Sequence, residues 1–294
     1  MFKKYYNSLL NNTLTVEEKK NLVALRLQDV YRQSVSIRVN NKMLKKGGVW
    51  NNNFSLPGLS KINIKNLKEK VKVDSLTIDE KDFYQRFLDA KFYAVHATNS
   101  PKVIDKESNL TLFSRNKLIE KGISFPKKNT TLVDRTWIAN DDNVFFSLEV
   151  GFAPSKNPRE NKGSRFGNTI YKIPFIAPVF DCASMVLFDQ IELENPRCHI
   201  NGLSSQAKSL LERRFKPNPN DICFYDRKDI LNSIALSIIE ITRRFKEKDK
   251  KIILGASSDK EFNDILRSFF RIEIRVPNTV MIAHEKYFRF HFGS

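Results

Sequence analysis

The chain reads Lys91-Phe92-Tyr93-Ala94-Val95-His96-Ala97-Thr98-Asn99 where a helical region gives way to strands. Its apolar residues predict a short β-strand that ends in a polar turn and carries His96, one of 4 histidines in the chain. An imidazole at a strand end offers one donor and one acceptor in fixed geometry. Taken alone, this histidine has two interpretations. It bonds a nearby carbonyl, or it contacts a ligand.

The residues before this stretch predict an N-terminal helical lobe, residues 1–90. Two capping boxes, Thr15-Val16-Glu17-Glu18 and Thr77-Ile78-Asp79-Glu80, place a glutamate three residues after a threonine cap and so predict two helix starts. The first helix is expected to run to about Arg32 and the second to about Ala90, with a short helix over Lys65–Lys72 and a polar loop over Asn40–Pro57 between them.

The residues after it predict a second domain, residues 91–294, of mixed strands and helices. Helices first, then many short strands around inserted helices, indicate an α+β fold and not a doubly wound parallel sheet. The expected strands are 92–95, 143–148, 169–175, 185–191, 251–254, 270–276, 279–283 and 287–292. The expected helices are 204–215, 227–248 and 259–269, and the expected loops are 105–126 and 153–167.

The composition argues against several classes of protein. A formal net charge of +17 is compatible with a polyanionic partner, but the shared abundance of Lys, Asn and Ile indicates compositional bias, and no nucleic-acid-binding signature is present. No apolar run is long enough to span a bilayer, and the N-terminus lacks the features of a secretory signal peptide. Cys182, Cys198 and Cys223 have no metal-ligand spacing, so we expect free, buried thiols and no metal site.

A second stretch with a functional interpretation is Arg271-Ile272-Glu273-Ile274-Arg275. In a strand, alternation puts the three charged side chains on one face and the two isoleucines on the other. One interpretation is an edge strand with a solvated charged face. The other is that Glu273 points into a cleft, held between arginines that keep it ionised.

A third stretch is Asn143-Val144-Phe145-Phe146-Ser147-Leu148-Glu149, followed after a loop by Ser164-Arg165-Phe166-Gly167. The paired phenylalanines are most simply core residues. The arginine and the glycine of the later part suit a phosphate group, because guanidinium and closely approaching backbone donors both bind phosphate.

The order of the three stretches resembles ADP-ribosyltransferases of the histidine–tyrosine–glutamate class. His96-Ala97-Thr98 is similar to their His-Gly-Thr strand, and Val144-Phe145-Phe146-Ser147 falls where their second strand packs a ring on nicotinamide. Glu273-Ile274-Arg275-Val276-Pro277 resembles the strand that bears their catalytic glutamate. More narrowly, the chain resembles the OspC/CopC family of bacterial type III secretion effectors. The resemblance implies an ADP-ribosyltransferase-like split β-sheet core with inserted helices behind the helical lobe.

This resemblance implies an NAD-dependent arginine ADP-ribosyltransferase or ADP-riboxanase. Members of the family take NAD⁺, release nicotinamide and join ADP-ribose to an arginine of a host protein, then lose ammonia as a ring closes. Their targets are host caspases, calmodulin is their activating partner, and the outcome is a block of host cell death. Type III secretion delivers them into the host cell cytoplasm.

The resemblance also implies roles for individual residues. Glu273 would be the catalytic carboxylate, because a negative charge beside the ribose stabilises the positive charge that develops as the nicotinamide bond breaks. Asp134 and Asp181 are candidates for the acid–base group that the target guanidinium needs, with turn capping as their alternative role. The implied NAD contacts are His96, Ala97, Thr98, Phe145, Phe146, Ser147, Arg165 and Phe166.

Two features depart from the family pattern. Arg275 stands where the family has a histidine, two residues after the catalytic glutamate. The C-terminal ankyrin repeats of many relatives are also missing from these 294 residues. The alternative prediction is therefore a catalytically weak or inactive relative that binds calmodulin or another host protein.

A calmodulin-binding helix is one interpretation of an apolar stripe within residues 227–248. Basic amphipathic helices are typical calmodulin targets, and this helix ends in several basic residues. A core helix whose basic end complements its dipole is the other interpretation. The stripe consists of Ile230, Ile234, Ile238, Ile241 and Phe245, and the N-terminal helix with Lys19, Lys20 and Arg26 is an equal candidate.

Overall fold

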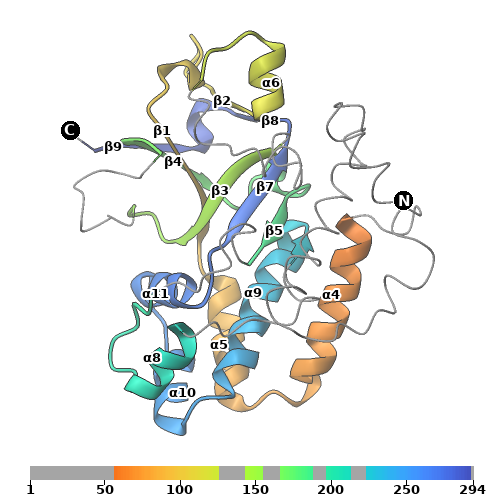
Figure 1. Cartoon of the computed structure of the whole chain (residues 1–294), viewed down its shortest axis with the longest axis vertical. Coiled ribbons are helices and arrows are strands. Elements are labelled where there is room, and N and C mark those ends of the chain that lie inside the picture. Colours follow the sequence, from red (N-terminus) through yellow and green to blue (C-terminus); the bar gives the residue numbers. More distant parts are fainter. Residues whose placement is uncertain (1–55, 126–142, 155–165, 188–196, 213–222, 293–294) are drawn as a thin grey trace.

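A computed structural model describes residues 56–125, 143–154, 166–187, 197–212 and 223–292, and these residues form an α+β fold (Figure 1). The helices are α4 (Leu56–Val71), α5 (Ile78–Asp89), α6 (Arg115–Glu120), α8 (Ser205–Glu212), α9 (Arg227–Thr242), α10 (Glu247–Leu254) and α11 (Asp259–Phe269). The strands are β1 (Phe92–Thr98), β2 (Leu110–Phe113), β3 (Asn143–Val150), β4 (Thr169–Pro174), β5 (Ser184–Val186), β6 (Cys223–Tyr225), β7 (Glu273–Pro277), β8 (Thr279–Ile282) and β9 (Phe288–His291).

Seven of these strands form one antiparallel sheet in the order β6-β5-β7-β3-β1-β4-β9. The sheet divides at β3. Residues 147–150 of β3 pair with β1, whereas residues 143–146 pair with β7. Beyond the last β1–β3 pair, Val95 with Ser147, β1 continues on β4 alone. The sheet is therefore two half-sheets that share one strand.

A buried lysine holds one half-sheet together. Lys172 on β4 donates from Nζ to Glu149 Oε2 on β3 at 2.9 Å, across the intervening strand β1. The same ammonium donates to the carbonyls of Gly151 at 2.9 Å and Ala153 at 3.0 Å, in the turn that follows β3. The Tyr93 ring of β1 lies 5.3 Å from Nζ. All three donors of this ammonium are used, which offsets the cost of burying its charge.

The helical layer forms around α9. In Figure 1 the helices α4, α5 and α9 lie together at one end of the sheet, and α6, β2 and β8 lie at the other. Contacts join α9 to α4, α5 and α10. The apolar stripe expected over 227–248 is buried, so it belongs to the core and does not form an exposed surface for calmodulin. Ile230, Ile234, Ile238 and Ile241 lie on α9, and Phe245 lies beyond its end at Thr242. The boundary at residue 90 stays a prediction.

Several sequence-based predictions are confirmed. The predicted capping box at Thr77 and Glu80 starts α5. The helix expected over 259–269 is α11, which begins at a capping box of Ser258 and Glu261 that was not predicted. Strands β1, β3, β4, β8 and β9 appear within a few residues of their predicted bounds. The helix expected over Lys65–Lys72 is longer, since α4 begins at Leu56. The helix expected after Thr15 and the helix candidate with Lys19, Lys20 and Arg26 lie outside the described residues.

Other predictions are wrong. The loop expected over 105–126 contains β2 and α6, and α6 begins where the Ser114 hydroxyl accepts a hydrogen bond from the Lys117 backbone N–H. The helix expected over 227–248 ends at Thr242, and the strand expected over 251–254 is the end of helix α10. Three consecutive apolar residues at 252–254 mimic a strand, but an acidic first turn favours a helix there. Strand β6 is not predicted, and Cys182 is exposed rather than buried.

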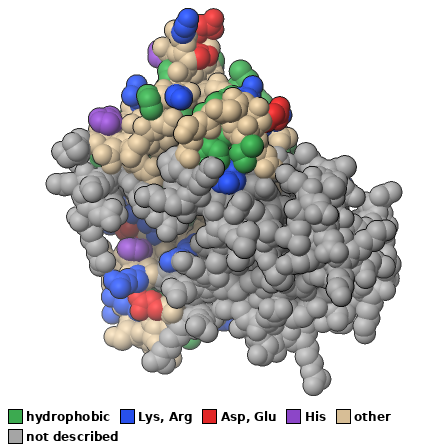
Figure 2. Space-filling model, turned by 45° about the horizontal axis from the view of Figure 1, so that its top comes forward, with side chains coloured by type: hydrophobic (Ala, Val, Ile, Leu, Met, Phe, Trp, Pro, Cys, Tyr) green, Lys and Arg blue, Asp and Glu red, His purple; other side chains and the backbone are tan. Residues whose placement is uncertain are grey.

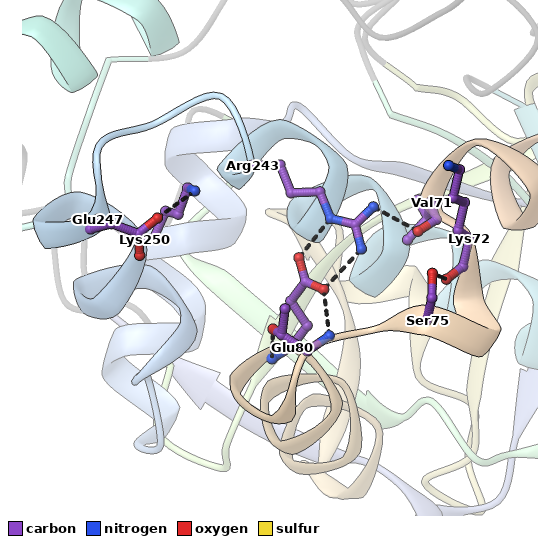
Figure 3. Close-up of polar contacts among 8 residues, drawn as sticks. Val71, Lys72, Ser75, Glu80, Arg243, Glu247 and Lys250 are labelled. Atoms are coloured by element: carbon purple, nitrogen blue, oxygen red, sulfur yellow. Dashed lines mark hydrogen bonds and ion pairs between the residues drawn. The ribbon is translucent and has the colours of Figure 1, made fainter.

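An ion pair between Arg243 and Glu80 fastens helices of the helical layer (Figure 3). Arg243, at the end of α9, donates from Nε to Glu80 Oε1 at 2.6 Å and from Nη2 to Glu80 Oε2 at 2.8 Å. Its Nη1 donates to the Val71 carbonyl at the end of α4, also at 2.6 Å. These bonds to the Arg243 guanidinium hold the pKa of the Glu80 carboxyl below its usual value. One arginine therefore joins the ends of three helices.

No helix within the described residues is long and apolar enough to cross a membrane.

We predict that Glu80→Gln lowers the free energy of unfolding by about 2 kcal/mol, because it removes the charge from a bidentate, largely buried hydrogen-bonded pair. The Glu80 side chain is only 6% exposed. A matched control is Glu247→Gln, whose ion pair with Lys250 is also drawn in Figure 3 but whose side chain is 78% exposed. The control should change the free energy by less than about 0.5 kcal/mol. Urea unfolding measures both, and equal effects would contradict the assignment.

Candidate functional site

The side chains on the two faces of the central strands differ in polarity. In the register of β5, β7 and β3, Met185 pairs with Ile274 and Ile274 with Phe146, and all three side chains are buried and apolar. One position along, Ser184 pairs with Arg275 and Arg275 with Phe145. Alternation then puts Glu273, which pairs with Val186, on the same face as Arg275. A glutamate, an arginine and a phenylalanine therefore share one face in the middle of the sheet.

Glu273 and Arg275 form an ion pair on that face. Arg275 Nη2 donates to Glu273 Oε2 at 2.7 Å, with side-chain exposures of 2% for the arginine and 31% for the glutamate. Strand β7 lies between β5 and β3, so the interpretation of this stretch as a solvated edge strand is wrong. The carboxylate remains partly accessible while its partner is buried beneath the surface.

The two phenylalanines of β3 have different surroundings. The Phe146 ring is buried, lies 5.7 Å from the His96 ring and packs edge-to-face on Phe180. The Phe145 ring is half-buried on the opposite face, with the Arg275 guanidinium 5.5 Å above its centroid. Phe145 is therefore the ring beside Glu273, whereas Phe146 is a core residue. Ser147, the next residue on the Phe145 face, is exposed.

His96 lies where β1 leaves β3. Its Nδ1 lies 2.9 Å from the Phe145 carbonyl oxygen, which is a hydrogen bond in which Nδ1–H donates. Burial lowers the pKa of this imidazole, and the bond to the Phe145 carbonyl raises it by a smaller amount. The ring is therefore neutral at pH 7, and its Nε2 keeps a lone pair that can accept a hydrogen bond from a hydroxyl group.

The first stretch and the later part of the third stretch meet at a close backbone contact. A Cβ atom on Gly167 would lie 2.2 Å from the carbonyl carbon of Thr98 and 2.5 Å from the backbone nitrogen of Asn99. The Asn168 N–H donates to the Asn99 side chain at 2.6 Å. Thr98 itself accepts from the Ser100 N–H through its hydroxyl, and Phe166 is exposed. The contact explains why a glycine stands at 167.

The structure describes two of the remaining predicted site residues, Asp181 and Ala97. Asp181 is 59% exposed, and its carboxylate lies 3.3 Å from Arg227 Nη2 at the end of a short 3-10 helix (Pro178–Phe180). Asp134 and Arg165 lie outside the described residues. Ala97 is half-buried on β1 and pairs with Ile170.

The structure brings the predicted residues together in two groups. Glu273, Arg275 and Phe145 share one face of the sheet, whereas the His96 ring contacts Phe146 on the other. The groups meet at β3, because His96 bonds the backbone of Phe145. Strands β1 and β7 flank β3, so about 10 Å separates them across two strand spacings. A ligand that contacts both His96 and Glu273 would have to bridge β3.

Sequence reasoning missed Ser184 and Lys172. Ser184 faces Arg275 from strand β5 but belongs to no motif. Lys172 has a signal in hindsight, since it is a single charge inside an apolar strand. Within the described residues no group of His, Cys, Asp and Glu could hold a metal ion. The described surface in Figure 2, at the top and the lower left of the view, mixes basic, acidic and hydrophobic side chains.

Comparison with known proteins gives one match. No family model matches the chain. The chain is 25% identical over 247 residues to the arginine ADP-riboxanase OspC1 of Shigella flexneri. The alignment covers 79% of this chain and 50% of the relative, so the chain spans about half the length of the curated protein that it matches.

We predict that Gly167→Ala disrupts the contact between the first and third stretches, because the new methyl group would overlap backbone atoms that cannot move aside. The expected loss is about 1 to 3 kcal/mol in the free energy of unfolding. Gly122→Ala tests backbone strain without a clash, since a Cβ there meets nothing within 4 Å. Thermal and urea unfolding compare the two, and a smaller loss in Gly167→Ala than in Gly122→Ala would contradict the prediction.

The depressed pKa of His96 predicts a pH dependence. The unfolded chain, with an ordinary histidine pKa near 6.5, binds a proton more readily than the folded chain. Stability is therefore fully present above about pH 6.5 and is lost as pH falls toward the folded pKa. His96→Asn keeps a donor for the Phe145 carbonyl but does not titrate. Urea unfolding from pH 8 to 5 should show a shallower decline in the variant than in the wild type, and parallel curves would disprove the effect.

Proposed function

We propose that this chain is the NAD-dependent transferase part of a bacterial effector that modifies an arginine of a host protein. The observation that carries the proposal is the 25% identity to an arginine ADP-riboxanase over 79% of the chain. The placement of Glu273 on a central strand, partly exposed and beside the Phe145 ring, is consistent with it. The division of the sheet at β3 supports a split-sheet, ADP-ribosyltransferase-like core.

In this proposal Glu273 performs the central step. Its carboxylate bonds a ribose hydroxyl and faces the positive charge that develops as the bond to nicotinamide breaks, which stabilises the transition state more than the ground state. The ion pair with Arg275 fixes the carboxylate on the strand. A fixed charge needs no reorganisation when the reaction occurs.

Other residues would bind and orient NAD⁺. Neutral His96 accepts a hydrogen bond from a ribose hydroxyl through Nε2, since its Nδ1–H is committed to the Phe145 carbonyl. Phe145 stacks on the nicotinamide ring, a role that suits a half-buried ring better than the buried Phe146. The proposed NAD⁺ contacts also include four residues of the same stretches, Thr98, Ala97, Ser147 and Phe166. Arg165 binds the pyrophosphate. Buried N–H groups of Arg275 that have no partner among the described residues also fit an anionic substrate.

The acceptor is proposed to be a guanidinium. An arginine side chain is fully protonated and needs a base to become a nucleophile. Asp134 and Asp181 are the candidates for that base and for the later loss of ammonia as a ring closes. Asp181 already pairs with Arg227, which favours a structural role for it and leaves Asp134 as the stronger candidate.

The host setting follows the family resemblance. A caspase is the proposed kind of target, calmodulin the proposed activator, and type III secretion into the host cytoplasm the proposed route. Since the apolar stripe of α9 is buried in the core, a calmodulin surface would have to lie elsewhere on the chain. The segment with Lys19, Lys20 and Arg26 is the remaining candidate.

A second candidate function is a non-catalytic relative that binds calmodulin or another host protein. The specific observation in its favour is the 2.7 Å bond by which Arg275 occupies Glu273 Oε2 at the position of the family histidine. Calorimetry separates the two candidates. Tight binding of calmodulin without binding of NAD⁺ would favour the non-catalytic relative.

We predict that Glu273→Gln lowers the transfer of label from radiolabelled NAD⁺ to host-lysate protein, in the presence of calmodulin, by at least about 100-fold. Free nicotinamide is measured in the same reaction. Glu285→Gln, an exposed glutamate outside the central strands, is the matched control and should retain activity within about twofold. Label that persists in Glu273→Gln, or no label with any variant, would overturn the enzymatic proposal.

A further inference from the structure

Arg275 is a buried cation that uses little of its hydrogen-bonding capacity. A guanidinium carries five N–H donors. In Arg275 only Nη2 has a recorded bond, to Glu273 Oε2 at 2.7 Å. Its Nε and Nη1 atoms are buried and have no hydrogen-bond partner in the part of the chain that the structure describes. The side chain is only 2% exposed, so bulk solvent does not replace the missing partners.

Two other cationic side chains of this protein have hydrogen bonds on each of their charged nitrogens. Lys172 uses its ammonium for a carboxylate and two carbonyls. Arg243 uses Nε and Nη2 for Glu80 and Nη1 for the Val71 carbonyl. Both act as structural clamps. Leaving buried donors unpaired is costly, and a group in that state calls for a specific explanation such as a bound ligand.

The surroundings of Arg275 indicate what such a ligand would be. Strand β7 is central, and Arg275 has Ser184 opposite on one side and Phe145 on the other. The Phe145 ring covers one face of the guanidinium at 5.5 Å, which leaves the N–H groups along its edge for a ligand. Arginine recognises oxyanions through that edge, and phosphate is among the best of them. The glutamate beside it already takes one donor, so the remaining donors suit a second anionic group.

We infer that Arg275 is an anion-binding residue of the Glu273 site, where its unpaired N–H donors bind phosphoryl oxygens of a nucleoside diphosphate. Its Nη2 meanwhile holds Glu273 in place. The inference deepens the proposed function and rests on it for the identity of the nucleotide, because NAD⁺ and ADP-ribose both carry a pyrophosphate. It assigns a binding role to the residue at which the chain departs from its family pattern.

Titration calorimetry of the full chain with ADP-ribose, adenosine and nicotinamide tests this inference. Arg275→Gln should weaken the binding of ADP-ribose at least tenfold and change the binding of neutral adenosine and nicotinamide less than twofold. Arg244→Gln removes the same charge from another arginine–glutamate pair, in which Arg244 is 48% exposed and bonds Glu240 at 2.6 Å, and it is the matched control. It should change ADP-ribose affinity less than threefold. Equal affinity of Arg275→Gln and wild type for ADP-ribose would overturn the inference.

Two further measurements keep the inference testable if Arg275→Gln does not fold. Arg275→Lys keeps the charge beside Glu273 but loses the fork, so it should still weaken ADP-ribose binding at least threefold. In the wild type, inorganic pyrophosphate should raise the melting temperature at concentrations where sodium chloride of equal ionic strength does not. Wild-type affinity in the lysine variant, or no pyrophosphate effect, would each contradict an anion site.

The outcomes also separate this inference from the proposed function. If ADP-ribose binds in an Arg275-dependent way but no nicotinamide is released from NAD⁺, the anion site is supported and the enzymatic function is contradicted. If nicotinamide release depends on Glu273 but Arg275→Gln binds ADP-ribose with unchanged affinity, the enzymatic function is supported and the anion site is contradicted.

Discussion

The fold depends on the way in which one strand, β3, is divided between two neighbours. Its later half pairs with β1 and its earlier half with β7, so the sheet consists of two half-sheets joined at that strand. Where β1 stops pairing with β3, the Phe145 carbonyl would lose a ladder partner, and the His96 imidazole takes that place. An unpaired buried carbonyl is costly, so the histidine completes the strand junction while its other nitrogen remains available.

Buried charges distinguish the structural parts of the molecule from the candidate site. The ammonium of Lys172 and the guanidinium of Arg243 each have bonds on every nitrogen, and each ties distant elements together. The guanidinium of Arg275 lacks such bonds among the described residues. A buried ion pair is weak support for stability, because desolvation offsets its Coulomb energy. The unpaired donors of the pair on β7 are what the proposed binding role would explain.

The similarity to an arginine ADP-riboxanase, at 25% identity and half the length of the relative, is in line with the family that the sequence resembles. Predictions from local sequence patterns were correct where the stabilising contacts are also local. The capping box at Thr77 and Glu80 predicted the start of α5, because both bonds of such a box form within four residues. Such predictions failed at α10, where a run of apolar residues resembled a strand, and at β2, a four-residue strand that is stable only through its pairing with β8 far along the chain.

The sequence by itself determined the α+β class and most of the strands, and it singled out His96, Phe145 and Glu273 as candidates. It could do so because periodicity, caps and the order of motifs are properties of short segments. Only the tertiary structure decided on which face of the sheet each of these side chains lies. The pairing of β7 with both β5 and β3 makes it an interior strand and puts Glu273 and Arg275 beside Phe145, while Phe146 turns into the core beside His96. Strand register joins residues more than a hundred positions apart, and no local pattern encodes which strand will lie on either side.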